Sequence, residues 1–302
     1  MYDVIIIGAG PAGMSAAVYA RRAGLTCLML ETDMYGGQIT TTPEVENYPS
    51  VTKISGWELA QNLYEHATSL GAEIAFENVI SLIDDRELKT VLTEENAYIC
   101  KAVIICNGAK RIKLGCDGEE RLSGAGVSYC ASCDGSFFKG KIAAVVGGGN
   151  TALEDALYLA NICEKVYLIH RRDEFRASKI LCDSVKKCSN INLCLCKTVS
   201  GINGENSVES ITLKDVTTGE ETDILSDCIF VAIGLAPENY IFRDIVELDS
   251  KGYIVADESC RTSAEGIFAA GDTRTKELRQ IVTACSDGAV AATAAASYIN
   301  SH

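Results

Sequence analysis

The chain has 302 residues, of which 47% are hydrophobic and 23% are charged, so it can bury one large core or two smaller ones, and its length favours two domains. Acidic residues outnumber basic ones by 41 to 27, and the net charge of −14 argues against binding to the phosphate backbone of nucleic acids. The N-terminus lacks the basic region of a signal peptide, and the alanine-rich C-terminal segment at 288–299 is too short to span a membrane.

Cysteines are numerous, and twelve of the fourteen lie outside a central Cys-x-x-Cys pair. These twelve follow no spaced framework, and in an oxidising compartment such a set would invite mispairing. We therefore expect a cytoplasmic protein in which these twelve cysteines are small buried apolar residues.

The first predicted elements form a strand–loop–helix–strand unit. A short apolar β-branched run at 4–7 is typical of a buried parallel strand, and Gly-x-Gly-x-x-Gly follows at 8–13. The first glycine permits a tight turn, the second lets the backbone approach a pyrophosphate, and the third lets the helix at 14–22 pack on the strand. A second strand at 26–30 ends in an acid that can accept hydrogen bonds from ribose hydroxyls. The unit predicts a dinucleotide site rather than an ordinary βαβ turn. Its candidate cofactor residues are Gly8, Gly10, Pro11, Ala12, Gly13 and Glu31.

The central pair is Cys130 and Cys133, whose spacing suits redox exchange or metal binding. A closed zinc site needs four ligands, but the chain has no second Cys-x-x-Cys, and its three histidines are not spaced like those of a zinc finger. A purely structural disulfide would close a very short loop and would restrict the unfolded chain little. We therefore favour a redox-active dithiol.

The strand–loop–helix–strand arrangement then returns. A strand at 142–146 leads into Gly-x-Gly-x-x-Ala at 147–152, a helix follows at 153–161, and the next strand occupies 166–169. The chain therefore carries two predicted dinucleotide folds. The candidate residues of the second loop are Gly147, Gly148, Gly149, Asn150 and Thr151.

Basic residues follow the strand at 166–169, at the position where the first unit has the acid Glu31. His170 stands eighteen positions after Ala152, as Glu31 does after Gly13, and Arg171, Arg172 and Arg176 follow it. Arginine can bind a ribose 2′-phosphate through charge-assisted hydrogen bonds, whereas an acid would repel it. This cluster predicts NADP rather than NAD, with a solvated basic helix start as the alternative.

Late in the chain, a strand and Gly271 precede Asp272, and Arg279, Gln280 and Ile281 introduce a last helix of small residues. From the residues alone, Asp272 could cap a helix or could direct its carboxylate at a polyol.

Together and in this order, the motifs resemble those of the low-molecular-weight thioredoxin reductases over nearly the whole chain. The segments that carry the resemblance are 8–13, 36–38, 46–47, 130–135, 147–152, 170–172 with Arg176, and 270–272 with 279–280. The resemblance implies an α/β fold with two Rossmann-like dinucleotide-binding domains. The FAD domain would comprise residues 1–114 and 244–302, and the NADPH domain, at 115–243, would be inserted within it.

The resemblance also implies the activity. NADPH would reduce FAD, FAD would reduce a Cys130–Cys133 disulfide, and the dithiol would reduce thioredoxin or a thioredoxin-like protein, in a homodimer with no nucleic-acid or membrane partner. Cys133 would face the flavin, Cys130 would attack the partner, and Asp134 would move protons. The turns at 106–109 and 115–118 depart from the family pattern. The remaining flavin-site candidates are Gly36, Gly37, Gln38, Asn47, Gly108, Gly271, Asp272, Arg279, Gln280 and Ile281.

Three alternatives remain. A flavin-dependent dithiol oxidase could use the same cysteines but needs no nicotinamide site, so the arginines oppose it. A reductase fed by ferredoxin would not require the second glycine loop. A redox sensor without turnover is disfavoured by the complete set of motifs.

Overall fold

The computed structural model describes residues 1–42 and 44–301 and divides the chain into two compact units. The first unit comprises 1–110 and 236–302, and the second comprises 111–235. The chain passes between them in β7 (Lys110–Arg111) and β16 (Leu235–Ala236), which pair as a two-stranded sheet. Within the described residues, no helix combines the length and apolar character needed to cross a membrane.

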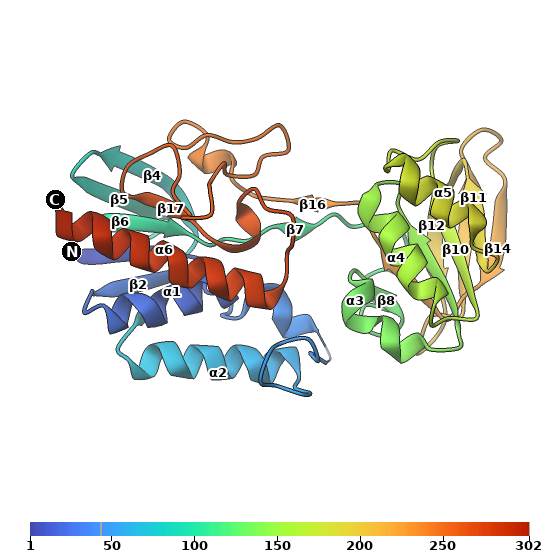
Figure 1. Cartoon of the computed structure of the whole chain (residues 1–302), viewed down its shortest axis with the longest axis horizontal. Coiled ribbons are helices and arrows are strands. Elements are labelled where there is room, and N and C mark those ends of the chain that lie inside the picture. The colour runs from blue at the N-terminus through green and yellow to red at the C-terminus, as the bar shows by residue number, and fades with distance from the viewer. Residues whose placement is uncertain (43, 302) are drawn as a thin grey trace. The chain divides into compact units, whose positions relative to one another are not determined.

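The first unit is built on a seven-stranded sheet (Figure 1). Its hydrogen-bonded order is β3-β2-β1-β6-β5-β4, and β17 pairs with the later half of β6. The strands β1, β2, β3, β6 and β17 pair with one another in parallel, whereas β5 pairs antiparallel with β6, and β4 pairs antiparallel with β5. The strands are β1 (Tyr2–Ile7), β2 (Cys27–Glu31), β3 (Glu73–Phe76), β4 (Val79–Asp85), β5 (Leu88–Thr93), β6 (Ala97–Ile105) and β17 (Ile267–Ala269).

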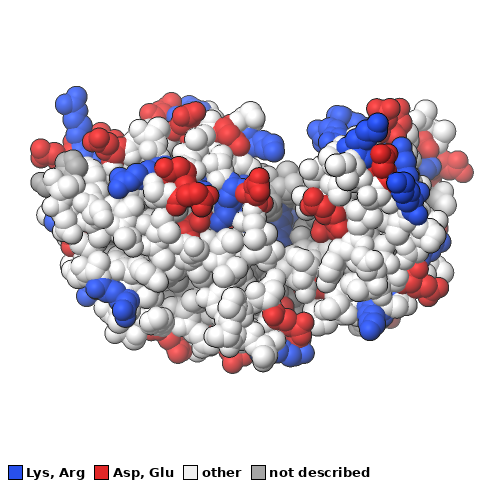
Figure 2. Space-filling model, viewed as in Figure 1, with Lys and Arg blue, Asp and Glu red and all other residues white. Residues whose placement is uncertain are grey.

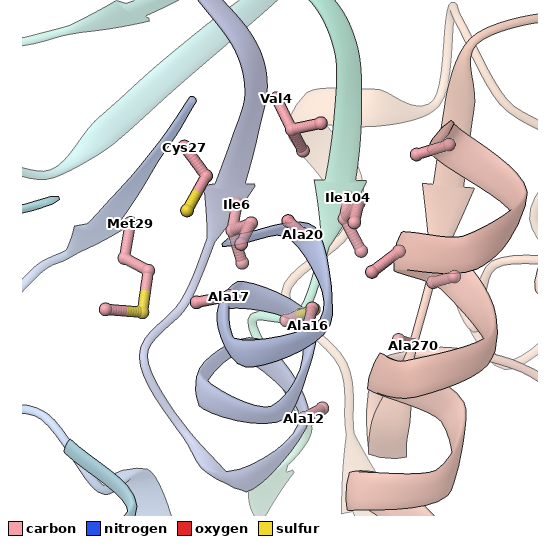
Figure 3. Close-up of a cluster of buried hydrophobic side chains, with 14 of the residues drawn as sticks. Val4, Ile6, Ala12, Ala16, Ala17, Ala20, Cys27, Met29, Ile104 and Ala270 are labelled. Carbon is pink, nitrogen blue, oxygen red and sulfur yellow. The ribbon is translucent and has the colours of Figure 1, made fainter. Parts of the chain in front are cut away.

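Two helices of small residues, α1 (Pro11–Arg22) and α6 (Ile281–Ser301), pack closely together on one face of this sheet. A Cβ atom on Gly288 of α6 would lie 2.1 Å from the carbonyl oxygen of Ala12, so the contact requires glycine. The further helices of the unit are α2 (Gly56–Ser69) and the short η1 (Gly37–Thr41), η3 (Tyr240–Phe242) and η4 (Gly271–Thr273). Figure 3 shows the shared core, with Val4, Ile6, Ile104, Cys27, Met29 and Ala270 around Ala12, Ala16, Ala17 and Ala20 of α1.

The second unit repeats the parallel design. Its five-stranded sheet has the order β11-β10-β9-β15-β8, and every pairing in it is parallel. A separate antiparallel sheet has the order β12-β13-β14. The strands are β8 (Val127–Ser128), β9 (Ile142–Val146), β10 (Lys165–His170), β11 (Ile191–Leu195), β12 (Lys197–Asn203), β13 (Ser210–Asp215), β14 (Glu221–Leu225) and β15 (Cys228–Val231). The helices are α3 (Ala131–Asp134), η2 (Gly135–Phe138), α4 (Asn150–Ala160) and α5 (Lys179–Lys187).

These two sheets with their helices confirm the predicted α/β class with two Rossmann-like folds. The crossings differ from the expected boundaries, since they lie at 110 rather than 114 and at 235 rather than 243. The second difference has a clear cause, because Phe242 is fully buried in the core of the first unit together with Val246. Asn239 is also held there, by a hydrogen bond of 3.0 Å to the carbonyl oxygen of Thr273.

Candidate active site

The first glycine loop joins β1 to α1 and is shaped by close backbone contacts. Gly8 has φ +103°, and a Cβ atom there would lie 2.5 Å from the carbonyl oxygen of Cys106. A Cβ atom on Gly13 would lie 1.9 Å from the carbonyl oxygen of Gly8. Gly10 caps α1 without any side-chain hydrogen bond, and Pro11 follows it. A Cβ atom on Gly10 would meet nothing within 4 Å, so the space beside the helix N-terminus is open to an anion.

Glu31 ends β2 beside this loop. Its Oε2 accepts a hydrogen bond of 2.8 Å from the amide of Ala9, and its Oε1 accepts one of 2.9 Å from the amide of Thr32. Each carboxylate oxygen can accept more than one hydrogen bond, so this anchored carboxylate can also receive a ribose hydroxyl. The loop and the acid therefore fit the adenosine and pyrophosphate parts of a dinucleotide.

Three further segments meet around the first loop. The amide of Gly36 donates to the carbonyl oxygen of Ala9 over 2.7 Å. The side-chain amide of Gln38 donates to the carbonyl oxygen of Ala109, next to Gly108. A Cβ atom on Gly271, whose φ is +80°, would lie 2.8 Å from Cβ of Ala12. The flavin candidates of the first unit are thus brought together, Gly37 included, since a Cβ atom there would lie 3.4 Å from Cα of Gly10.

Asp272 and Arg279 belong to the same loop cluster. Asp272 lies inside η4, whose N-cap is Ala270, so Asp272 does not cap this short helix. Nε of Arg279 donates to the carbonyl oxygen of Asp272 over 3.4 Å, and its guanidinium lies 4.2 Å from the ring centroid of Tyr253. Asn47 and Gln280 are also joined, by a side-chain hydrogen bond of 3.2 Å, immediately before Ile281 opens α6.

A buried ionic network, which the sequence reasoning missed, anchors this cluster to α6. Asp287 accepts hydrogen bonds from Arg274 over 2.8 and 2.9 Å and from Lys276 over 2.8 Å, and a fourth of 3.0 Å from the amide of Gly271. Burial alone would raise the pKa of Asp287, but these two cations outweigh it and lower the pKa. The sequence did hold a signal, because Asp287 is the only charged residue in the α6 sequence.

The central cysteines form a disulfide in the second unit. Cys130 and Cys133 are bonded with their Cα atoms 5.3 Å apart, and Cys130 is the N-cap of α3. The other twelve cysteines are free thiols, but only six of them are buried and six are half-buried, so the expectation that all twelve are buried is wrong for half of them. No cluster of three or more metal-ligating side chains occurs among residues 1–42 and 44–301.

Asp134, directly after the disulfide, is linked to a residue that the sequence reasoning did not single out. Its Oδ2 accepts a hydrogen bond of 2.6 Å from the hydroxyl of Ser128. The same hydroxyl oxygen accepts a bond of 3.2 Å from the amide of Cys130. Burial raises the pKa of Asp134, while Ser128 and the charge of Arg111 act in the opposite direction. A carboxyl group with a raised pKa that directly follows the disulfide in the chain is suited to proton exchange with a thiol.

The second glycine loop joins β9 to α4. A Cβ atom on Gly147 would lie 2.4 Å from the carbonyl oxygen of Ala232, so this position also requires glycine. Gly149 caps α4 without a side-chain hydrogen bond, and a Cβ atom there would meet nothing within 4 Å. The N-terminus of α4, which begins Asn150-Thr151, is therefore open in the same way as that of α1. Oδ1 of Asn150 accepts a hydrogen bond of 2.9 Å from the amide of Ser178.

His170 lies beneath this loop. A Cβ atom on Gly148 would fall 2.2 Å from the imidazole ring, and the ring of Phe175 stacks at a centroid distance of 5.4 Å. Burial, and then the positive charges of Arg176 and its neighbours, lower the pKa of His170, which keeps the ring neutral. The ring therefore supports Gly148 from below and does not point into solvent.

The arginines that follow have the opposite environment. Arg171, Arg172 and Arg176 are exposed, and their side chains form no hydrogen bond or ion pair with the part of the chain that the structure describes. The amide of Arg176 donates to the carbonyl oxygen of Gly148 over 2.7 Å, which holds this segment against the loop. Figure 2 shows basic side chains gathered over the part of this unit that holds α5. The three exposed guanidinium groups can bind a phosphate group on a dinucleotide held at the neighbouring loop.

Comparison with known proteins agrees with this arrangement. A family model for pyridine nucleotide-disulphide oxidoreductases matches residues 2–288. The chain is 47% identical to a thioredoxin reductase of Bacillus subtilis, over 99% of this chain and 95% of that protein. The solved thioredoxin reductase of Streptococcus pyogenes is 42% identical, with a TM-score of 0.95 and coverages of 100% and 99%. That of Lactococcus lactis, in its FR conformation, is 41% identical, with a TM-score of 0.71 and full coverage of both chains.

Two glycine loops and a disulfide on such a fold define the class of flavin- and nicotinamide-dependent disulfide oxidoreductases. The identity to its relatives extends over almost the full length of both chains. The chain belongs to the thioredoxin reductase family, which confirms the resemblance found in its motifs.

Proposed function

We propose that this protein is an NADPH-dependent flavoenzyme that reduces the disulfide of thioredoxin or a thioredoxin-like protein. The observation that carries the proposal is the Cys130–Cys133 disulfide, which lies in the same unit as a glycine loop flanked by three exposed arginines. A disulfide alone would suit an oxidase or a sensor as well. The arginines add the means to bind a phosphorylated nicotinamide cofactor, which neither alternative needs.

FAD is assigned to the first unit and supplies, when bound, the two-electron chemistry between NADPH and the disulfide. The open N-terminus of α1 would receive its pyrophosphate, and Glu31 would accept its ribose hydroxyls. The loops around Gln38, Asp272 and Arg279 would hold the remainder. Because Asp287 ties Gly271 to α6, the loop that carries Asp272 is positioned before any cofactor binds.

NADPH is assigned to the second unit. The open N-terminus of α4 would bind its pyrophosphate, and the three arginines would bind the 2′-phosphate. His170 supports Gly148 from below, so its proposed role is to shape the loop and not to contact the phosphate.

The dithiol delivers electrons to the partner protein. By the family resemblance, Cys130 attacks the partner disulfide and Cys133 faces the flavin. A thiolate is the competent nucleophile, so one thiol must first lose its proton, and Asp134 is the neighbouring group able to accept it.

The disulfide and the proposed NADPH loop share one unit, while the proposed FAD loop lies in the other. We therefore propose that the units turn about β7 and β16, so that each reactant reaches the flavin alternately. If the turn limits turnover, kcat will fall in proportion to solvent viscosity, whereas a kcat that is independent of viscosity would place the slow step elsewhere.

We further propose a homodimer in the cytoplasm. Large apolar side chains that remain exposed in the first unit, including Trp57, Phe76 and Ile80, support association with a second copy. Twelve free thiols are compatible with a reducing compartment. Molecular mass measured in solution by light scattering tests the dimer.

The function is tested with the purified protein. We expect a yellow protein whose flavin absorption is bleached by NADPH and recovers when oxidised thioredoxin is added. Consumption of NADPH should match the reduction of thioredoxin one to one. Rapid reoxidation by oxygen without thioredoxin would instead indicate a dithiol oxidase, and a flavin that NADPH does not bleach would contradict the nicotinamide assignment.

A further inference from the structure

The hydroxyl of Ser128, on β8, is hydrogen-bonded both to the backbone of Cys130 and to the side chain of Asp134. Its side chain is buried, with 7% of its surface exposed. The amide of Cys130 donates to its oxygen over 3.2 Å, and Oδ2 of Asp134 lies 2.6 Å from the same oxygen. One hydroxyl therefore contacts both the backbone of the cysteine and the carboxyl group of the acid.

The direction of these two hydrogen bonds follows from their chemistry. A backbone amide can only donate, so Ser128 must accept from Cys130, and its own proton is left for Asp134. A separation of 2.6 Å falls in the range of a hydroxyl that donates to an ionised carboxylate. The carboxylate is thus held through Oδ2 in a fixed orientation.

The second oxygen of Asp134 is different. Oδ1 is buried and has no hydrogen-bond partner among residues 1–42 and 44–301. A proton can therefore bind to Oδ1 while the Ser128 bond to Oδ2 remains intact. A buried polar atom without a partner is costly, and a redox or catalytic role is one reason for which native structures retain such an atom.

We propose that Ser128 is a positioning residue that fixes Asp134 for proton exchange with the dithiol, an inference that rests on the proposed function. In the reduced protein, Oδ1 takes the proton of one thiol, and the resulting thiolate attacks the disulfide of the partner. The S–S bond of the partner breaks as a mixed disulfide forms, and Asp134 returns its proton to the leaving sulfur. Asp134 then takes the proton of the second thiol, whose thiolate attacks the mixed disulfide, closes the Cys130–Cys133 bond and releases the other sulfur of the partner. That sulfur receives the second proton, so two electrons and two protons pass to the partner.

Among residues 1–42 and 44–301, one charged side chain has a resolved electrostatic effect on the pKa of Asp134. Arg111 on β7 favours its ionised form. The helix α4, which packs against α3, carries Asp155, whose pKa burial raises to about 6. Tyr129 directs its hydroxyl to Glu119 over 2.9 Å, and η2 has no titratable side chain. Because the pKa of Asp155 is raised as well as that of Asp134, a pH profile alone would not identify Asp134, and a double-mutant cycle is needed.

The test uses Ser128→Ala, Asp134→Asn and the double variant in the full flavin-loaded enzyme. Each is reduced with one equivalent of NADPH, and its reoxidation by a small disulfide such as DTNB is followed in a single turnover between pH 5 and 9. Without its donor, the carboxylate holds a proton more readily. We expect Ser128→Ala to be about tenfold slower at pH 7, as the loss of one hydrogen bond to a charged group predicts, with its profile moved to higher pH.

The cycle separates positioning from a general structural effect. In the Asp134→Asn background, Ser128→Ala should cause no further loss. Ser128→Thr keeps the hydroxyl on a strand and should restore the original profile. Ser226→Ala is the matched control, because it removes another buried hydroxyl of the same unit, bonded to the carbonyl oxygen of Cys228 and remote from Asp134 in sequence.

The proposal is overturned if Ser128→Ala retains the original profile, or if it slows the reaction equally with and without Asp134. Flavin reduction by NADPH, unchanged in each variant, confirms that the protein has folded, and Ser128→Gly replaces any alanine variant that fails this check. Reoxidation by DTNB does not involve thioredoxin. A protein that cannot reduce thioredoxin but shows the predicted cycle would therefore refute the proposed partner and leave the role of Ser128 intact.

Discussion

The two glycine loops are built alike, yet the groups that surround them differ. In both, the first glycine lies against a carbonyl oxygen of a neighbouring strand segment, and the residue before the helix faces open space. The first loop is joined by an acid, Glu31, whose oxygens already hold two backbone amides. The second is joined by a buried neutral histidine and three exposed arginines. The shared backbone provides an anion site, while the residue types at the strand end select the nucleotide.

The largest expected effect concerns the Cys130–Cys133 disulfide, which the second unit has and the first unit lacks. Cys130→Ser and Cys133→Ser should each abolish thioredoxin reduction, because neither can form the disulfide, while bleaching of the flavin by NADPH persists. If Cys133 faces the flavin, only Cys130→Ser should show a long-wavelength band from a thiolate beside the ring.

The control is Cys194→Ser, which alters a half-buried free thiol of the same unit and should leave activity unchanged. Residual thioredoxin reduction in either disulfide variant would show that electrons reach the partner by another route.

The second prediction concerns the buried ions of the first unit. Asp287→Asn leaves Arg274 and Lys276 buried without a counter-ion, which should lower the free energy of unfolding by about 3–5 kcal/mol. The pKa of Asp287 is lowered in the folded chain, so its contribution is complete above the unfolded value of about 3.9 and disappears as the pH falls through the folded value.

Thermal unfolding of the flavin-loaded protein, followed by flavin fluorescence, measures the loss. Asp244→Asn, which removes an exposed carboxylate from the same unit, should change stability little. Equal effects of the two substitutions would show that the buried network does not stabilise the loop.

The third prediction tests nucleotide selection. Arg171→Ala with Arg172→Ala removes charge-assisted hydrogen bonds worth about 1.5–3 kcal/mol each to the 2′-phosphate, so KM for NADPH should rise by an order of magnitude or more. KM for NADH, which lacks that phosphate, should change little.

Lys186→Ala with Lys187→Ala removes the same charge from the exposed last turn of α5 and should preserve the preference for NADPH. If the double arginine variant still preferred NADPH over NADH as strongly as before, the 2′-phosphate would have to be bound by other residues.

How far the sequence predicts this molecule depends on whether a feature is local. The strands and helices of both loops were predicted to within a few residues, because apolar runs and glycine spacing are local signals. The position of His170 was also predicted by spacing, but its burial beneath Gly148 was not, since the path of the following segment determines it. Ser128 and Asp287 were missed because their partners are set by tertiary structure, although a serine two residues before the dithiol could have been noted.

The antiparallel parts of the sheets were also missed. Buried and exposed residues alternate only partly along β4, β5, β12, β13 and β14, so the two-residue hydrophobic period that predicts a strand is weak there. These strands extend the units and carry none of the predicted site residues. The regions that were predicted best are therefore the two glycine loops, in which the residues that shape the backbone are also the residues expected to bind a cofactor.

The smallest expected effect lies at the third position of each loop, where the first has Gly13 and the second has Ala152. A Cβ atom on Gly13 would lie 1.9 Å from the carbonyl oxygen of Gly8, so Gly13→Ala must displace the loop, at a cost of about 1–3 kcal/mol, and FAD should bind more weakly. The second loop has room for a methyl group, and Ala152→Gly should cost only the helix penalty of about 0.5–1 kcal/mol and leave NADPH binding intact. Titration of each cofactor with thermal unfolding of each variant measures both effects. If Gly13→Ala bound FAD normally, FAD binding would not require the close contact between Gly13 and Gly8. The two loops would then differ in function only through the residues at their strand ends.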